Sequence, residues 1–452
     1  MKKIKILSLL AIPIFSSIPL MITSCNDNEH IPTNSLNNYV VFKKENTEIK
    51  RYAPIYTVNE FNLLCSDGDS SAIITIGKNN FKKNEIISIS FNEDGKFVDE
   101  NILTTINDNF LYKCTSFNSE IILPKSITKI GKNFMFFCIS FNSKIVIQNK
   151  TKVIETDFMS HCEKFNQDII FPDSIEEIST SCLSSCFDFN SNVTLPSNLL
   201  FLGSYFLSFD NNFNVSFSIP NSLKKISPFF LYYCEKFNQP IFFPNELTEI
   251  GACFLLGCYK FNQVIDIPNT VEIIGSQFLQ GCVELNSPVT IGTNIKEIRA
   301  SFLQNCTNFN SQVTFSSPST LQRIGGGFLS KCIFFNKQIS LPSTLKEIGN
   351  NFLSACDSFN KNITLPDNMN KIDGTFLFCA NNFCSTLDIG NNNVNIWIQT
   401  YDGGFNQNLS TIFNDQIEYT QGVTIIGTYK TEFCTKFPNR TEQTPYRKLI
   451  ST

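Results

Sequence analysis

The chain has 452 residues, with 45 Phe but a single Trp, and its formal net charge is −4. An acidic balance without a basic stripe argues against nucleic acid as a partner. A chain of this length can form several globular domains, so its internal organisation has to decide the architecture.

The N-terminus has the pattern of a secretory signal. A basic start over residues 1–5 precedes an apolar run over residues 6–22, which two prolines interrupt and which is short for a membrane span. Residues 22–25, Ile-Thr-Ser-Cys, resemble a lipobox. The sequence therefore predicts a signal peptide over residues 1–24 and a lipid on Cys25 that holds the protein at the membrane. The alternatives are an uncleaved anchor helix and an ordinary signal peptide.

Two atypical segments precede the regular part of the chain. Residues 25–53 are polar and lack sustained periodicity, which predicts a lipidated cysteine followed by a tether, with room for some order in it. Residues 54–109 contain a damaged repeat, in which Phe91 and Asn92 are two residues out of phase whereas Leu103 is in phase. Terminal repeats are atypical because they cover the open end of a core. We therefore expect an N-terminal cap over residues 54–109.

A 24-residue repeat occupies residues 110–389 and is marked by a cysteine in each copy. Asp210 takes one of these positions without a change of phase, and a two-residue insertion precedes Cys332. A fixed period of this length is typical of a solenoid, whose coils stack to bury a continuous core. The cysteine column consists of Cys114, Cys138, Cys162, Cys186, Cys234, Cys258, Cys282, Cys306, Cys332, Cys356 and, one residue early, Cys379.

Each copy carries the same local signals. Phe and Asn follow the cysteine by three and four residues, and an alternating segment such as residues 338–341 then predicts a short strand with one buried face. A proline usually closes this strand, because proline cannot donate to a ladder. An apolar pair and a nearly unbroken Phe column come next. We interpret the last quarter of each copy, for example residues 349–356, as a single helical turn.

The pattern Ile-Gly-x-x-Phe-Leu-x-x-Cys-x-x-Phe-Asn-x-x-Ile-x-Leu-Pro-x-x-Leu-x-x-Ile resembles the BspA-type leucine-rich repeat, although Phe stands where that repeat usually has Leu. Residues 158–167 and 254–263 are also similar to a related repeat in surface lipoproteins of wall-less bacteria. The resemblance implies an α/β to mostly β solenoid, a right-handed coil with a parallel β-sheet on one face and short helical turns on the other. It also implies display at a cell surface. It implies no reaction, because members of the family are regarded as adhesins, antigens and binding scaffolds.

Residues 390–452 leave the repeat. Segments 394–398 and 422–427 predict strands, and Gly403-Gly404 predicts a turn. A C-terminal cap is the favoured interpretation of this segment, and a small ligand-binding module is the alternative.

The 17 cysteines of an exported protein would ordinarily suggest disulfides, and cysteines one coil apart are close enough to pair. The column lies beside Phe, however, and Asp210 interrupts it without a change of phase, so we interpret it as a ladder of small buried side chains. A local disulfide between Cys379 and Cys384 is a further possibility. A thiolate metal site is a weaker interpretation, since such sites need four converging ligands.

The asparagine column is predicted to be a buried structural ladder, in which side-chain amides satisfy backbone groups of their own and the next coil. This interpretation is preferred to a glycan or substrate site. The ladder residues are Asn118, Asn142, Asn166, Asn238, Asn262, Asn310 and Asn360.

We find no catalytic signature. The sequence has no glycine-rich phosphate loop, no Gly-x-Ser-x-Gly and no His-Glu-x-x-His motif. A nucleophile with a histidine base would have to use His30 or His161, the two histidines of the chain. We therefore expect no enzymatic activity, no metal and no small-molecule cofactor.

The outward face of the predicted strands remains, at six and eight residues after each cysteine. Exposed apolar clusters there indicate a protein contact, although a flanking segment such as the tether is an equal candidate to cover them. The candidate ligand-binding residues are Ile122, Val146, Ile170, Pro240, Phe242, Val264 and Asp266.

Together these features predict a lipid-anchored protein on the extracellular face of the membrane that binds a host or matrix protein. Two alternatives stay open. One is a passive surface antigen or coat component, and the other is a scaffold that carries an activity in residues 390–452.

Overall fold

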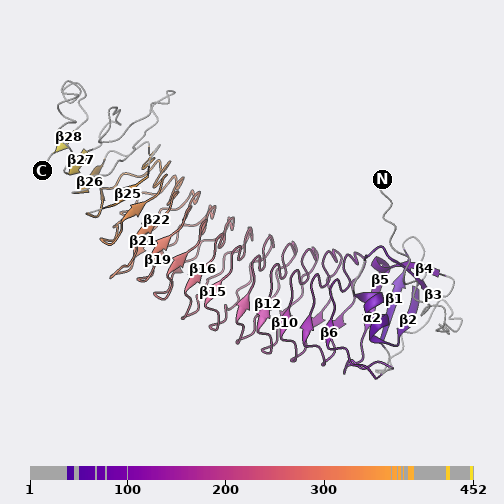
Figure 1. Ribbon diagram of the computed structural model, residues 1–452. Helices are drawn as coiled ribbons and strands as arrows, with labels where there is room; N and C mark the ends of the chain where they lie inside the picture. Colours follow the sequence, from indigo (N-terminus) through magenta and orange to yellow (C-terminus); the bar gives the residue numbers. More distant parts are fainter. Residues whose placement is uncertain are drawn as a thin grey trace, which may run out of the picture.

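The computed structural model describes residues 38–44, 50–66, 69–76, 79–98, 100–367, 369–373, 375–377, 380, 385–390, 424–427 and 448–450. Cys25, Cys379, Cys384 and most of residues 390–452 lie outside this part of the chain. The described residues form a gently curved stack of coils with a small mixed unit at its N-terminal end (Figure 1). The prediction of a repeat solenoid with parallel strands is confirmed.

The N-terminal unit combines an antiparallel sheet with a short helix. The sheet order is β2-β1-β5, and β3 and β4 form a separate hairpin. The helix α2 begins after Thr57, whose side chain accepts the N–H of Glu60 while the Glu60 carboxylate accepts the N–H of Thr57. The bounds are β1 Asn38–Lys43, β2 Lys50–Ile55, α2 Val58–Cys65, β3 Ile73–Ile76, β4 Asn79–Lys82, a 3-10 turn Lys83–Glu85 and β5 Ile86–Ser90.

Residues 25–53 were expected to be a tether with room for some order, and within them residues 38–43 and 50–53 belong to strands. Val40 and Phe42 of β1 are fully buried, and the Phe42 ring lies 5.2 Å from that of Phe81. The apolar run of β1 is short and stands among polar residues, so it gave no sustained periodicity. On the other side of this unit, the ring of Phe61 in α2 lies 6.0 Å from that of Phe110, so the unit packs on the N-terminal end of the solenoid core.

No helix in the described ranges combines the length and the apolar character that crossing a membrane requires. α2 is 8 residues long.

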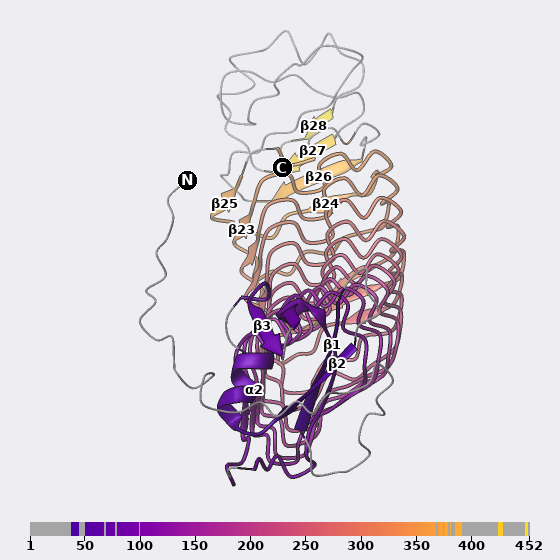
Figure 2. The ribbon, with the colours of Figure 1, turned by 90° about the vertical axis from the view of Figure 1, so that its right-hand side faces the viewer.

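Each regular coil contributes up to two very short strands, and the stacking of coils gathers them into two rows of parallel strands. Row A contains the alternating segments before the proline, as predicted. Row B contains the second residue of the apolar pair that follows and the residue before it, a segment for which the sequence predicted no strand. Figure 2 separates the rows, with β23 and β25 of row B on one side and β24 and β26 of row A on the other.

The two rows have the following members. Row A comprises β7 Ile121–Ile122, β9 Ile145–Val146, β11 Ile169–Ile170, β13 Val193–Thr194, β17 Ile265–Asp266, β19 Val289–Ile291, β21 Val313–Phe315, β24 Ile363–Thr364, β26 Thr386–Gly390, β27 Thr424–Gly427 and β28 Lys448–Ile450. Row B comprises β6 Thr105–Ile106, β8 Lys129–Ile130, β10 Val153–Ile154, β12 Glu177–Ile178, β14 Phe201–Leu202, β15 Lys225–Ile226, β16 Glu249–Ile250, β18 Ile273–Ile274, β20 Glu297–Ile298, β22 Arg323–Ile324, β23 Glu347–Ile348 and β25 Lys371–Ile372.

Residues that occupy the same position of the repeat lie opposite each other in neighbouring coils. Ile154 lies opposite Ile130 in one neighbouring coil and Ile178 in the other. Row A also continues beyond residue 389, where the repeat was expected to end, because β27 and β28 extend β26 as parallel strands.

The segment expected as a helical turn has a different backbone. Alternate residues adopt positive φ, for example Asn351 (57°), Leu353 (53°) and Ala355 (53°). Their N–H groups reach neighbouring coils, as a helical turn would not allow. Met135 N, for instance, donates to Phe110 O at 2.7 Å. Left-handed backbone costs a non-glycine residue about 1–2 kcal/mol, and the bonds between coils offset this cost.

Two columns of phenylalanine rings fill the core. The ring centroids of Phe110 and Phe134 are 4.9 Å apart, and those of Phe134 and Phe158 are 5.0 Å apart. In the second column, those of Phe117 and Phe141 are 5.9 Å apart. Buried Cys182 replaces one ring of the first column and buried Leu285 one ring of the second, and elsewhere neighbouring rings stack, so one apolar core runs along the stack.

The cysteines that the structure describes are buried free thiols. From Cys138 to Cys356, each column S–H donates to the carbonyl of the residue three before the cysteine position of the preceding coil, as Cys138 does to Leu111 O at 3.0 Å and Cys162 to Met135 O at 3.2 Å. Burial raises the pKa of Cys138 well above its usual value. The thiols therefore stay protonated and act as hydrogen-bond donors.

Asp210 interrupts this thiol ladder with a buried acid. Its Oδ1 accepts the N–H of Cys186 at 2.6 Å, whereas its Oδ2 has no partner. The carbonyl of Leu183, which a thiol at position 210 would reach, accepts no hydrogen bond in the structure. Burial raises the pKa of Asp210 well above its usual range, against the opposing effect of the hydrogen bond from the backbone of Cys186.

We expect Asp210→Asn to raise the free energy of unfolding at pH 8 by about 1–3 kcal/mol, the typical penalty of a buried unsatisfied polar group. The amide keeps the acceptor for Cys186 N and supplies a donor for Leu183 O. Because folded Asp210 holds its proton more tightly than the unfolded chain, its contribution to stability falls as pH rises above about 4 and levels off above its raised pKa.

The gain from Asp210→Asn should therefore be larger at pH 8 than at pH 5. Thermal and urea unfolding of both proteins at the two pH values measure it. An equal gain at both values would contradict the assignment of Asp210 as a buried titrating group.

Candidate binding face on row A

The outward side chains of row A form two apolar clusters. Alternation along each strand buries Ile121 and leaves Ile122 51% exposed. The N-terminal cluster consists of Ile122, half-buried Val146 and Ile170, which is 65% exposed. Val146 lies beside Ile122 in the strand register.

The central cluster lies further along the stack. It consists of exposed Pro240, Phe242 and Val264, of which Phe242 is 74% and Val264 49% exposed. Asp266, also exposed, occupies the same position as Phe242 one coil later and adds a charge beside this cluster. All seven candidate residues named from the sequence are thus at least partly accessible on one face.

A groove of about 830 Å³ crosses β9, β11 and β13 at the N-terminal cluster. Val146, Ile170 and Phe171 supply its apolar part, and Asp168 and Asp173 supply charge. Hydrogen bonds from the side chain and backbone of Asn192 lower the pKa of Asp168, and those from the backbone and side chain of Ser197 lower the pKa of Asp173. Both carboxylates therefore stay ionised well below neutral pH.

The groove coincides with a missing step of the row A ladder. Ile121 N donates to Lys144 O at 3.0 Å, and Ile169 N donates to Asn192 O at 2.9 Å. The intervening step, from β9 to β11, has no such bond, and the N–H groups of Ile145 and Ile147 donate to no protein atom in the structure. The sequence had no signal for this gap, because the alternating pattern continues through it.

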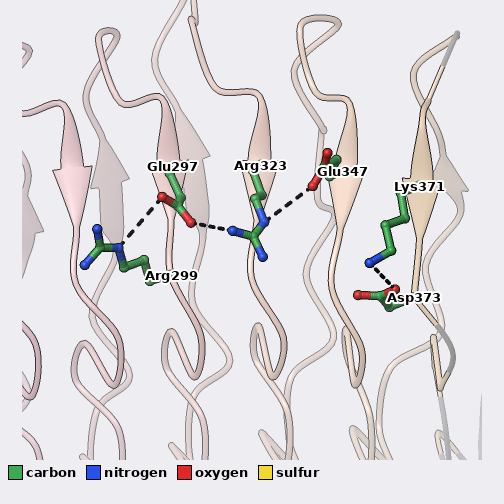
Figure 3. Close-up of polar contacts among 6 residues, drawn as sticks. All are labelled: Glu297, Arg299, Arg323, Glu347, Lys371 and Asp373. Carbon is green, nitrogen blue, oxygen red and sulfur yellow. Dashed lines mark hydrogen bonds and ion pairs between the residues drawn. The ribbon is translucent and has the colours of Figure 1, made fainter.

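Row B has a different surface, because its charged side chains pair with one another. Lys129 and Glu155 are 2.6 Å apart, and Lys225 and Glu249 are 2.9 Å apart. Figure 3 shows the chain of ion pairs in which Arg323 bridges Glu297 at 2.8 Å and Glu347 at 3.5 Å. These paired charges occupy much of the row B surface, and its exposed apolar side chains lie at β14, where Leu200 is 66% and Phe201 48% exposed.

The asparagine column forms a continuous ladder, but it is not buried as expected. Asn142 N donates to Asn118 Oδ1 at 2.7 Å, and Asn286 N donates to Asn262 Oδ1 at 2.7 Å. Six of the seven predicted residues follow the same rule within the column: Asn142, Asn166, Asn238, Asn262, Asn310 and Asn360 each donate to the preceding asparagine. The side chains are exposed or half-buried because the column lies at the edge of the coil, where water reaches it.

The candidate histidine takes part in ring contacts. His161 is half-buried and stacks on Phe137, with ring centroids 4.2 Å apart. Burial lowers the pKa of His161, against the opposing charges of Glu163 and Asp157. Within the described part of the chain, no three His, Cys, Asp or Glu side chains converge as metal ligands. His30 and Cys25 lie outside that part.

Comparison with known proteins gives one family. The model described as a BspA type leucine rich repeat region matches residues 34–157, 74–216, 205–333 and 310–437. None of the curated proteins compared with the chain matches it.

Three similar solved structures share low identity with the chain. A leucine-rich repeat protein from Bacteroides ovatus is 19% identical, covering 80% of this chain and 94% of its own, with a TM-score of 0.43. A leucine rich cell surface protein from Faecalibacterium prausnitzii is 15% identical, covering 81% and 90%, with a TM-score of 0.39. The pneumococcal vaccine antigen PcpA is 14% identical, covering 85% and 100%, with a TM-score of 0.39.

We expect Asn262→Ala to lower the free energy of unfolding by about 0.5–1.5 kcal/mol, because it removes the acceptor of Asn286 N and Ser287 Oγ. Asn308→Ala is the matched control, an exposed asparagine outside the column, and should change stability by less than about 0.5 kcal/mol. Urea unfolding of both variants measures the difference. Equal losses would show that the ladder bond contributes nothing specific.

Proposed function

This chain belongs to the BspA type leucine-rich repeat family, and we propose that it is a cell-surface protein that binds a protein ligand through the row A face. Solenoids present extended surfaces of repeated strands, and such surfaces are the usual binding faces of repeat proteins. The family model spans most of the chain and supports the solenoid fold. A fold does not determine a function, so the binding site is inferred from the side chains.

The observation that carries the proposal is the contrast between the two rows. Row A leaves Ile170 and Phe242 largely exposed, whereas the charged side chains of row B pair with one another. Water-exposed aromatic and aliphatic side chains that cluster on one face favour contact with another protein, and Phe and Ile are suited to anchor such a contact in a partner's pocket.

The groove gives the ligand a chemical character. Its apolar side chains suit apolar groups of a partner, and the ionised carboxylates of Asp168 and Asp173 favour a basic residue beside them. The unpaired N–H groups of Ile145 and Ile147 suit carbonyl oxygens. A polypeptide segment with apolar and basic side chains supplies apolar groups, a positive charge and carbonyl oxygens. We propose that this segment belongs to a host or matrix protein.

We propose further that a lipid on Cys25 holds the protein on the outer face of the membrane. The support is the order of the basic start, the apolar run and the Ile-Thr-Ser-Cys motif. Two or more acyl chains on one residue anchor a protein durably, since each buried CH₂ contributes about 0.8 kcal/mol.

We expect the variant Ile122→Asp, Ile170→Asp, Phe242→Asp to lose binding to extracellular-matrix proteins at least about tenfold, because charge at a desolvated contact is costly. Surface plasmon resonance of the 26–452 protein over immobilised collagen, laminin and fibronectin measures saturable binding.

The matched control changes three apolar residues of comparable exposure outside row A, Ile73→Asp, Val98→Asp and Phe334→Asp, and should bind as the natural protein does. Circular dichroism verifies that both variants fold. Equal binding by both would remove the site from row A, and no saturable binding by any protein would favour a coat component without a specific ligand.

We expect Cys25→Ala to shift the full-length protein from the membrane fraction to the medium or to an uncleaved precursor, because no acyl chain can be attached to alanine. Metabolic labelling with an alkynyl fatty acid, followed by fractionation, measures both lipid and location. Label that persists in the variant would contradict lipidation at Cys25.

A further inference from the structure

Aromatic side chains form a connected patch on the third side of the coils, which follows row B and precedes row A along the chain. Tyr205 stacks on Phe229 with ring centroids 4.2 Å apart, and Phe209 stacks on Tyr233 at 6.0 Å. Tyr232 contacts both stacks crosswise, with its ring at 89° to those of Phe209 and Phe229. The aromatic patch consists of Tyr205, Phe209, Phe229, Tyr232, Tyr233 and Tyr259, each at least partly exposed.

The stacking of coils does not require these rings. In three later coils, within residues 301–357, the equivalent positions hold no aromatic residue. The backbone bonds between coils are nevertheless the same, because Asn305 N donates to Ser330 O at 2.9 Å as Phe209 N donates to Tyr232 O at 2.7 Å. A smaller ring cluster, within residues 112–161, uses the same positions nearer the N-terminal end. Exposed rings that the fold can do without, gathered on one side, favour contact with a ligand.

The aromatic patch borders an open space that contains an unsatisfied amide. A Cβ on Gly257 would lie 2.9 Å from Cδ1 of Tyr233, so that ring packs directly on the glycine backbone. One coil later, a Cβ on Gly281 would have only Gly257 within 4 Å, at 3.9 Å, apart from its neighbours in the chain. Gln280, whose carbonyl accepts from Gly257 N at 2.9 Å, has a buried Oε1 with no hydrogen-bond partner among the described residues. An O–H or N–H group of a ligand would satisfy this oxygen.

The charges around the aromatic patch favour an uncharged ligand. The patch itself contains no Asp, Glu, Lys or Arg. At its edge, Lys260 pairs with Glu284, and Lys236 donates to Asn212 Oδ1 at 2.7 Å. Glu235 adds one carboxylate there. A strongly charged ligand would therefore find no cluster of opposite charge to match it.

Rings, hydroxyls and an amide together fit a carbohydrate. A sugar presents apolar C–H faces that pack on aromatic rings, and hydroxyl groups that both donate and accept hydrogen bonds. The hydroxyls of Tyr205 and Tyr232 have no hydrogen-bond partner in the described part of the chain, and Gln280 Oε1 needs a donor. We propose that the aromatic patch, with the open space beside Gly281, binds an uncharged carbohydrate. This site is separate from row A and does not depend on the protein ligand proposed there.

An array of immobilised neutral and acidic glycans tests the site with the full-length protein. We expect saturable binding to one or more neutral glycans, and a loss of affinity of at least about tenfold in the variant Tyr232→Ser, Tyr233→Asn, Tyr259→Thr. Each replacement is the residue that a later coil holds at the same position, so the fold should persist. Circular dichroism verifies that it does.

Tyr56→Ala is the matched control, because Tyr56 is a 42% exposed tyrosine outside the aromatic patch. This control and the row A variant Ile122→Asp, Ile170→Asp, Phe242→Asp should bind the glycan as the natural protein does, so failure here is distinct from failure of the row A site. No binding to any neutral glycan, or equal binding by the patch variant, would overturn the proposal. Loss of matrix-protein binding in the patch variant, without glycan binding, would overturn it in favour of a protein ligand.

Gln280→Leu separates the effect on binding from the effect on stability. Leu256 holds the same position one coil earlier, so leucine fits there. The variant removes a buried oxygen without a partner and should unfold at the same or a higher urea concentration than the natural protein. Its affinity for the glycan should fall about three- to tenfold, the contribution of one hydrogen bond. Unchanged affinity would overturn the placement of the ligand beside Gly281.

Discussion

The structure depends on hydrogen bonds that run from each coil to the next at a fixed register. A two-residue strand has no sheet partner within its own coil, so its backbone groups are satisfied only where the following coil places the matching groups. The thiol of Cys138, the amide of Asn118 and the left-handed N–H of Met135 all make bonds of this kind. A residue type repeats every 24 positions because its partner is its own equivalent or a neighbour of that equivalent, and Asp210 shows what a departure leaves unsatisfied.

This dependence explains what could be predicted from the sequence. The column spacing and the alternation around Ile122 give the solenoid and the outward face, since both are periodic. Row B has no such signal, because the apolar residues leading into a strand such as β12 are three apart, as Ile175 and Ile178 are, and do not alternate. A helical turn was predicted where Leu353 has a positive φ. The sequence could not show this backbone, because its energetic cost is offset by hydrogen bonds to neighbouring coils and not by any local signal. The asparagine pattern predicts the ladder but not its exposure, because an amide can make these hydrogen bonds at the edge of the coil as well as in the core. The groove beside Ile170 lies where the backbone hydrogen bonds between β9 and β11 are absent. The alternating sequence pattern continues through both strands, so it could not predict this gap.

The two rows show how one coil serves two surfaces. Row B carries charges whose partners lie one coil away, as with Arg323 between Glu297 and Glu347 (Figure 3), so these charges are paired within the molecule. Row A has polar pairs of the same kind, such as Asn192 with Asp168, but interrupts them with Ile170 and Phe242. These exposed apolar side chains are left facing water, without the packing contacts that buried apolar side chains make within the protein. They are the part of the surface whose contacts must come from elsewhere, whether from a ligand or from a further segment of the chain.

The thiol ladder has a consequence for how such a chain can be made. Its cysteines stabilise the fold as donors in their protonated form, and burial keeps them out of reach of oxidants. Folding of these coils therefore needs no thiol oxidase and no disulfide isomerase, because no cysteine pairs have to be formed or corrected. Each coil can dock on the previous one as soon as its residues are available. A protein built in this way can mature in a compartment that lacks any machinery for disulfide formation.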